Sequence, residues 1–139
     1  MAALSEYAPD SYQHLTRQLS FYMAFAFITT LFRELIKDVE DLPGDLKTGC
    51  QTLAVKAGVE TSKRWIFGVA FASIGLIIYA FSNFNSLQPL LLFIPVWGTI
   101  LFALLLVVRA RETNDFKKIS TLAKVIILLG LILFPILNP

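Results

Sequence analysis

The sequence is poor in the side chains that most often build metal or redox centres. It contains one cysteine, Cys50, and one histidine, His14, in 139 residues. A single cysteine cannot form a disulfide within the chain, and His14 has no metal-ligand partners near it in the sequence. We interpret Cys50 as a small packing residue rather than a nucleophile. Residues 1–8 also lack the basic start and the apolar stretch of a cleavable signal peptide.

Charge is scarce as well, at 16% of the residues. Four apolar stretches carry no charge at all: Leu19–Phe32, Trp65–Phe84, Leu87–Val108 and Val125–Leu137. The second and third each have about twenty residues, the length that an α-helix needs to cross a hydrocarbon core of ~30 Å. Their apolar residues do not alternate with polar ones, and only helices or closed barrels cross a membrane. The composition therefore predicts an all-α, multi-pass membrane bundle rather than a soluble domain.

We expect four membrane helices, over about 11–41, 61–84, 89–108 and 120–137, in a single membrane-embedded region. Apart from Arg17 and Arg33 in the first helix, the basic residues fall into two groups that flank the second and third helices: Lys37, Lys47, Lys56, Lys63 and Arg64, then Arg109, Arg111, Lys117, Lys118 and Lys124. The connection between these two helices, residues 82–89, carries no charge. The positive-inside rule then places residues 38–60 in the cytoplasm and both chain ends outside the inner (plasma) membrane. We expect a lipid bilayer around the chain and no nucleic-acid partner.

Against this apolar background, the sequence KDVEDLPGD at residues 37–45 gathers four acids within nine residues. On a helix, Glu34, Asp38 and Asp41 fall within about 60° of one another. The same stripe continues upward through Thr30, Phe27, Met23, Ser20 and Thr16, whereas the opposite face carries Phe21, Phe25, Ile28 and Phe32. Small polar residues of membrane helices usually face the bundle interior. The pattern predicts that the acid stripe points inward, with its acids at the cytoplasmic end.

The proline after the acids is expected to end this helix. Pro43 disfavours helical conformation in the residue before it, and Gly44 permits a tight turn. Asp45 would then lie on a loop that folds back beside Asp41, so that several carboxylates converge. Such like charges need basic partners, which Lys37 partly provides, or a divalent cation such as Mg²⁺. From the pattern alone, a solvated, salt-bridged helix end and a metal site both remain open.

The stretch RELIKDVEDLPGDLKTGCQTLAVKAG, residues 33–58, resembles the second aspartate-rich motif of the UbiA superfamily of intramembrane prenyltransferases. The resemblance rests on the acid pair Asp41 and Asp45 with three residues between them, on Lys37-Asp38 before it, and on the glycines and the Thr-Leu pair that follow. The residues RELIKDVED are most similar to those of the branch of geranylgeranylglycerol-phosphate geranylgeranyltransferases, and quinone-directed members are close relatives.

This resemblance implies transfer of a prenyl group from a prenyl diphosphate to a lipid or aromatic acceptor, with Mg²⁺ on the diphosphate. It implies that Asp38, Asp41 and Asp45 bind the metal, Asp41 and Asp45 being the residues essential for catalysis. It also implies that Lys37 and Arg33 contact phosphate, although Arg33 at the membrane interface is an equal alternative. Phe27 and Met23 would line the prenyl tunnel, unless they only pack against neighbouring helices.

The resemblance also implies parts that this sequence does not contain. Family members have nine helices and a first Asn/Asp-rich motif, whereas four helices fit here, and they correspond to the last four. The only acids before Arg33 are Glu6 and Asp10, both expected outside. We therefore expect the chain to be inactive alone. Three alternatives remain open: a truncated or frame-shifted reading frame, a remnant, or one half of a split enzyme whose second chain supplies the first motif. The alternative is a non-catalytic membrane protein whose acidic cluster binds cations or a partner subunit.

Overall fold

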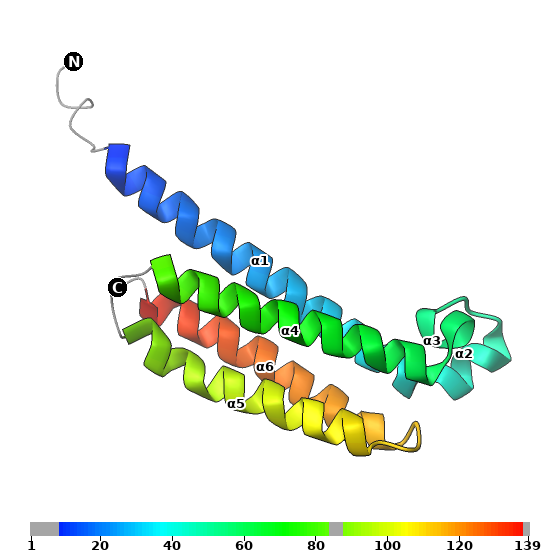
Figure 1. Cartoon of the computed structure of the whole chain (residues 1–139). Helices are drawn as coiled ribbons and strands as arrows, with labels where there is room; N and C mark the ends of the chain where they lie inside the picture. Colours follow the sequence, from blue (N-terminus) through cyan, green and yellow to red (C-terminus); the bar gives the residue numbers. More distant parts are fainter. Residues whose placement is uncertain (1–8, 84–87, 138–139) are drawn as a thin grey trace.

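The computed structural model describes residues 9–83 and 88–137, and every regular element within them is an α-helix (Figure 1). The helices are α1 (Pro9–Glu40), α2 (Leu42–Thr48), α3 (Leu53–Ala57), α4 (Val59–Asn83), α5 (Gln88–Arg109) and α6 (Asp115–Leu137). The predicted all-α class is therefore confirmed. Four helices are long, and α2 and α3 are short helices at one end of the bundle.

The four long helices form a ring in which each contacts two neighbours. Helix α1 packs against α4 and α6, and α5 packs closely against α6 and less extensively against α4. In the described residues the backbones of the diagonal pairs, α1 with α5 and α4 with α6, do not approach each other closely. The core lies inside this ring, and its largest fully buried side chains are Phe116, Ile36, Ile66, Ile100, Ile119 and Ile126.

Two helical segments of the described chain are long and apolar enough to cross a membrane, Leu19–Glu40 and Val59–Tyr79. A third apolar segment, Ile94–Arg109, is shorter. Large apolar side chains are exposed on all four long helices, among them Phe71 on α4 and Leu105 on α5. Such a surface suits a hydrocarbon environment, because in water exposed apolar patches of this extent are rare on monomeric proteins. Two of the four predicted membrane helices thus meet the length and composition of a span.

Helix boundaries follow the prediction to within two residues, except at the start of α6. This helix begins at Asp115 instead of residue 120, because the Asp115 carboxylate accepts hydrogen bonds from the backbone N–H groups of Arg111 (3.0 Å) and Glu112 (3.2 Å). These bonds fold the connection back onto the first turn of the helix. Helix α4 also starts slightly early, at Val59, so that Ser62 lies inside it and donates to the Gly58 carbonyl (3.0 Å).

The polar segment after α1 is largely helical, and the prediction of a loop over residues 38–60 was wrong. Pro43 lies in the first turn of α2, where its missing N–H costs nothing and its fixed φ favours a helix. Gly44 lies inside α2 and makes no tight turn. The left-handed conformations occur instead at Gly49 (φ 73°) and Gly58 (φ 82°), which end α2 and α3.

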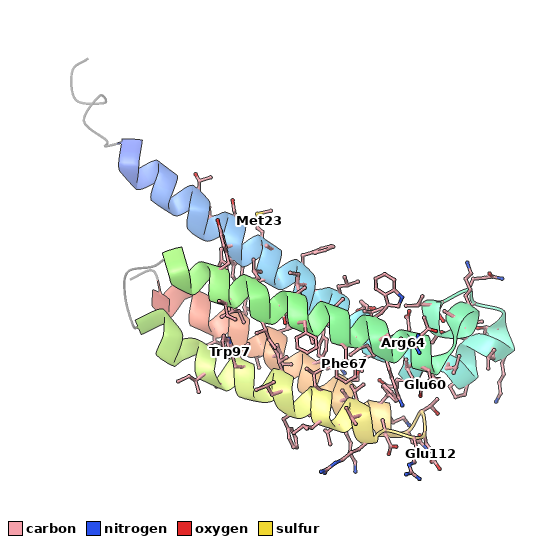
Figure 2. The ribbon with its side chains drawn as sticks, in the orientation of Figure 1. Met23, Glu60, Arg64, Phe67, Trp97 and Glu112 are labelled. Atoms are coloured by element: carbon pink, nitrogen blue, oxygen red, sulfur yellow. The ribbon has the colours of Figure 1, made fainter. Side chains whose placement is uncertain are left out.

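The acid stripe of α1 faces away from the other long helices, contrary to the predicted inward orientation. The side chains of Met23 and Phe27 are 68% and 69% exposed, and Figure 2 shows Met23 pointing away from α4 and α6. The opposite face is the one that packs, with Phe25 and Phe32 each only 3% exposed. The aromatic face buries more apolar surface against neighbouring helices than a stripe of hydroxyls and acids, and this difference decides the orientation within this chain.

Helix α1 packs tightly on α6 at a glycine. A Cβ placed on Gly130 would lie 2.6 Å from Cε1 of Phe25, so the ring occupies the space that any other residue would fill. The Phe25 ring also stacks on Phe21, with centroids 6.4 Å apart. Close approach at a small residue is the usual way in which membrane helices pack.

Candidate functional site

The acidic cluster, Asp38, Asp41 and Asp45, lies at the end of α1 and the start of α2. Asp38 is in the last turn of α1, Asp41 forms the junction, and Asp45 is in the first turn of α2. The Asp41 carbonyl accepts hydrogen bonds from the N–H groups of Gly44 (2.8 Å) and Asp45 (3.0 Å). This junction turns the chain sharply while it keeps the three carboxylates on one short stretch of backbone. The segment predicted as a loop after Asp41 is thus a helix–helix junction, and the joint binding of a metal by the three acids stays a prediction.

Asp38 is the most enclosed member of the cluster. It is half-buried, and the backbone amide of Leu53, at the start of α3, interacts with its carboxylate. The carboxylates of Asp45, Glu34 and Asp41 all lie near enough to repel it. Burial and three neighbouring negative charges disfavour the charged form of Asp38, and either a proton or a bound cation would offset this cost.

Two cations of α1 are already paired with acids. Lys37 donates to the Asp41 carboxylate one turn later, and Arg33 pairs with Glu34. Both pairs are partly exposed, so solvent screens them and each contributes little to stability. Neither Asp38 nor Asp45 forms an ion pair within the described residues. Of the five polar residues expected at the site, Lys37 is thus paired with Asp41, Asp38 lies near Asp41 and Asp45, and Arg33 is paired with Glu34 instead of an aspartate.

The donor set fits a cation that needs few protein ligands. In the described part of the chain, no group of three or more His, Cys, Asp or Glu side chains is placed to hold a metal ion. Asp38 and Asp45 nevertheless offer carboxylate oxygens that no cationic side chain of the described chain neutralises. Mg²⁺ keeps several waters and is commonly held by one or two carboxylates together with substrate phosphates. The residues therefore suit Mg²⁺ bound jointly with a phosphorylated ligand and do not form a complete protein cage.

Helices α2 and α3 form a cap that folds back onto the end of α1 and the start of α4. Ala54 of α3 is buried in the core, which anchors the cap. In the turn between the two helices, the Thr48 hydroxyl contacts Sγ of Cys50 at 3.3 Å, and Cys50 is exposed. The predicted role of Cys50 as a packing residue is therefore wrong. The hydroxyl of Thr52 is buried and has no hydrogen-bond partner among the described residues.

Lys63 is a structural residue of this end of the bundle that the sequence did not reveal. Its Nζ donates to the Ala110 carbonyl (2.9 Å) beyond the end of α5, and it pairs with Glu60 (3.1 Å). The pair with Glu60 could be read from the spacing of three residues on one helix. The bond to Ala110 could not, because 47 residues separate the two partners. Lys63 therefore closes the α4–α5 side of the ring, where the helices contact one another least.

The apolar residues Phe27 and Met23 lie above the acids on the same exposed face of α1. With a rise of about 1.5 Å per residue, Met23 lies about 22 Å from Asp38 along the helix axis. We call the exposed apolar side chains of this part of α1, Met23, Phe27 and Leu31, the apolar track; Thr30 and Glu34 interrupt it, and it lies above the carboxylates and cations. Such a track matches the chemistry of an amphiphile with an apolar chain and an anionic head.

Comparison with known proteins gives a consistent result over most of the chain. A model of the UbiA prenyltransferase family matches residues 5–134. The digeranylgeranylglyceryl phosphate synthase of Korarchaeum cryptofilum is 33% identical over 134 residues, which cover 88% of this chain and 45% of that protein. The proteins of the same name from Thermococcus kodakarensis and Methanopyrus kandleri are 30% and 33% identical over 111 residues, 78% of this chain in each case.

The chain spans less than half the length of these curated relatives, 39% and 40% for the last two. No solved structure matches the chain. The matched region contains the acidic cluster, the cap formed by α2 and α3, and all four long helices up to residue 134.

Proposed function

Because this chain belongs to the UbiA prenyltransferase family, we propose that it forms part of an enzyme that transfers a prenyl group from a prenyl diphosphate to a membrane-soluble acceptor. The observation that carries the proposal is the continuity of the apolar track on α1 with the acidic cluster below it. A prenyl chain would lie along Met23 and Phe27, and its diphosphate would reach Asp38, Asp41 and Asp45. The protein would work as a multi-pass membrane protein with this end in the cytoplasm.

The acceptor that the relatives favour is a glycerol-based lipid. Their name describes a glyceryl phosphate with two geranylgeranyl groups. We therefore propose a glyceryl phosphate that already carries one such group as the acceptor, ahead of an aromatic quinone precursor. Its hydroxyl would attack the allylic carbon as the bond to the diphosphate breaks, so that diphosphate leaves with the bonding electrons and the hydroxyl proton is released.

The side chains of this chain would bind and orient the diphosphate. Asp38 and Asp45, which lack cationic partners in the described residues, would hold Mg²⁺ together with Asp41. When bound, Mg²⁺ would stabilise the negative charge on the leaving diphosphate. Lys37 and Arg33 would exchange their present carboxylate partners for phosphate oxygens, to which cationic side chains bind strongly. The apolar walls would exclude water from the allylic centre.

The exposure of the track also supports a site that additional protein completes. In this chain Met23 and Phe27 are open on the side away from α4 and α6. A prenyl cation needs shielding on all sides, and the family resemblance implies that the first, Asn/Asp-rich motif lies opposite the motif of residues 33–58. We propose that these four helices correspond to the last four of a nine-helix fold. Further helices, whether from a longer chain or from a second subunit, would then cover the acid stripe.

The direct test is binding of geranylgeranyl diphosphate to the purified chain in detergent, with and without Mg²⁺. We expect the Asp41→Asn/Asp45→Asn variant to weaken Mg²⁺-dependent binding at least about tenfold, equivalent to ~1.4 kcal/mol. The matched control is Glu60→Gln/Glu112→Gln, which removes two exposed acids at the same end of the bundle. Unchanged binding in the aspartate variant, or an equal loss in the control, would contradict the metal-site proposal.

Turnover separates a complete site from a partial one. We expect no Mg²⁺-dependent transfer from geranylgeranyl diphosphate by the chain alone, and activity when a second chain with an Asn/Asp-rich motif is added. Robust turnover by the chain alone would show that the site is complete.

The alternative function is a non-catalytic membrane protein that binds cations or a partner subunit through the acidic cluster. It is favoured by the pairing of Lys37 with Asp41, which already neutralises one of the three carboxylates. Under this alternative, cation binding would not depend on a prenyl diphosphate. Calorimetric titration of Mg²⁺ with and without the diphosphate distinguishes the two functions.

A further inference from the structure

The connection between α5 and α6 carries a concentrated positive charge that the proposed site does not use. We define the basic hairpin as the five exposed cations Arg109, Arg111, Lys117, Lys118 and Lys124. They occupy the end of α5, the connection and the first turns of α6. Figure 2 marks this connection by Glu112, at the same end of the bundle as the cap formed by α2 and α3.

These cations are not neutralised by the part of the chain that the structure describes. Its ion pairs are Arg33–Glu34, Lys37–Asp41 and Lys63–Glu60, and none involves the basic hairpin. Two acids lie in the same segment: Glu112, which forms no ion pair among the described residues, and Asp115, whose carboxylate accepts from two backbone N–H groups and attracts Lys118, so five cations face two acids. The hairpin thus presents a net positive surface to whatever lies next to it.

The surface that continues from the cations is apolar. On α6 the exposed side runs from Lys117 and Lys118 through Lys124 to Leu128, which is 55% exposed. On α5 it runs from Arg109 back to Leu105, which is 58% exposed. A surface with cations at one end and apolar side chains beyond them fits the boundary between lipid headgroups and acyl chains. A nucleic acid or an acidic peptide would match the cations but not the apolar side chains.

We propose that the basic hairpin binds the phosphate groups of anionic lipids in the leaflet on the side of α2 and α3. The Lys124 stem would lie along the apolar surface and extend its ammonium group to the headgroups. Juxtamembrane clusters of four or more cations attract anionic lipids in this way. The proposal rests on the membrane embedding proposed above, but not on the prenyl diphosphate site.

The test is lipid selectivity of the full chain reconstituted in bilayers of phosphatidylcholine and phosphatidylglycerol. Spin-labelled analogues of both lipids report which one is retained next to the protein. We expect phosphatidylglycerol to be preferred, and Lys117→Gln/Lys118→Gln to reduce the preference by about fivefold for each cation removed. Lys117→Arg/Lys118→Arg should retain it, because the charge remains.

The matched control is Lys47→Gln/Lys56→Gln, which removes two exposed cations from the cap at the same end. A preserved preference in this variant supports a site on the hairpin, and an equal loss would show a dependence on net charge only and overturn the proposal. No preference in the unmodified chain would also overturn it.

Further measurements distinguish lipid phosphate from free phosphate. They also show whether a negative result contradicts the lipid proposal alone or the membrane embedding on which it rests. If inorganic phosphate removes the preference at an ionic strength where chloride does not, the site binds free phosphate and the lipid proposal is wrong. If the chain does not float with vesicles, the membrane embedding fails and both proposals fall. Loss of diphosphate binding in the aspartate variant with lipid selectivity intact would show that the two proposals are independent.

Discussion

The two faces of α1 differ in composition, in burial and in the role that we assign to them. One face carries Phe25, Thr29 and Ile36, each almost completely buried against α4 and α6. The other carries Met23 and Phe27 and ends in the acids. The packed face stabilises this chain by itself, whereas the open face contributes little to its stability and carries Met23, Phe27 and Asp38, with Asp41 and Asp45 following it at the junction and in α2. The comparison shows that structure and function are separated on opposite sides of one helix.

Replacement of a phenylalanine on each face is the strongest test of this separation. Phe25→Ala should destabilise the chain by about 3–5 kcal/mol, because it leaves a cavity in the packed face. Phe27→Ala should leave the free energy of unfolding nearly unchanged, because the side chain is 69% exposed, and should weaken geranylgeranyl diphosphate binding. Unfolding by a denaturing detergent measures the first effect. Equal destabilisation by the two changes would show that the faces are not distinct.

A substitution on α6 tests how tightly this helix packs against the packed face of α1. Gly130→Ala places a methyl group 2.6 Å from the Phe25 ring and should cost about 1–3 kcal/mol through overpacking. The control is Gly68→Ala on α4, where a Cβ meets nothing within 4 Å. That change should stabilise the helix by about 0.5–1 kcal/mol. A stable Gly130→Ala protein would contradict the close contact, and Gly130→Ala/Phe25→Leu should recover part of the loss.

A substitution of Lys63 tests whether its bond to Ala110 holds α4 in place. Helix α4 is one of the two helices that cover the packed face of α1. Lys63→Met removes the bond to the Ala110 carbonyl and should cost on the order of 1 kcal/mol. Hydrogen exchange should increase at the α5–α6 connection. Lys56→Met, at an exposed lysine without an ion pair in the described residues, is the control and should leave both measurements unchanged.

The smallest expected effect concerns the start of α6, the other helix that covers the packed face. The N–H groups of Arg111 and Glu112 lower the pKa of Asp115. A depressed folded-state pKa contributes stability above the unfolded value of about 3.9, and this contribution is lost as the pH falls through the folded pKa. Asp115→Asn should therefore lower the melting temperature slightly at neutral pH.

The decisive observation for Asp115 is the pH dependence of that difference. It should disappear when the pH falls below the folded pKa, because the carboxyl group of the unmodified protein is then protonated. A difference that persists in strong acid would assign the effect to lost geometry instead of charge.

Local pattern predicted much of the fold and the location of the site. Uncharged apolar runs indicated the long helices, and α1 ends at Glu40, one residue before the predicted end. The motif at residues 33–58 indicated the family, which the comparisons confirm. The early start of α6 and the helical cap were missed, because both depend on hydrogen bonds between a few backbone N–H groups and one oxygen. Propensity alone does not register such bonds.

The sequence by itself determined that the chain is helical and apolar and that α1 carries aromatic residues on one face and acids on the other. Both features follow from residue type and from the 3.6-residue period. Only the tertiary structure decided which face of α1 is covered, since periodicity fixes two opposite faces but not the partner of either. In the structure the aromatic face of α1 packs against α4 and α6, because that contact removes more apolar surface from the surroundings and packs Phe25 onto Gly130. The acid stripe remains open, with its carboxylates gathered at one end.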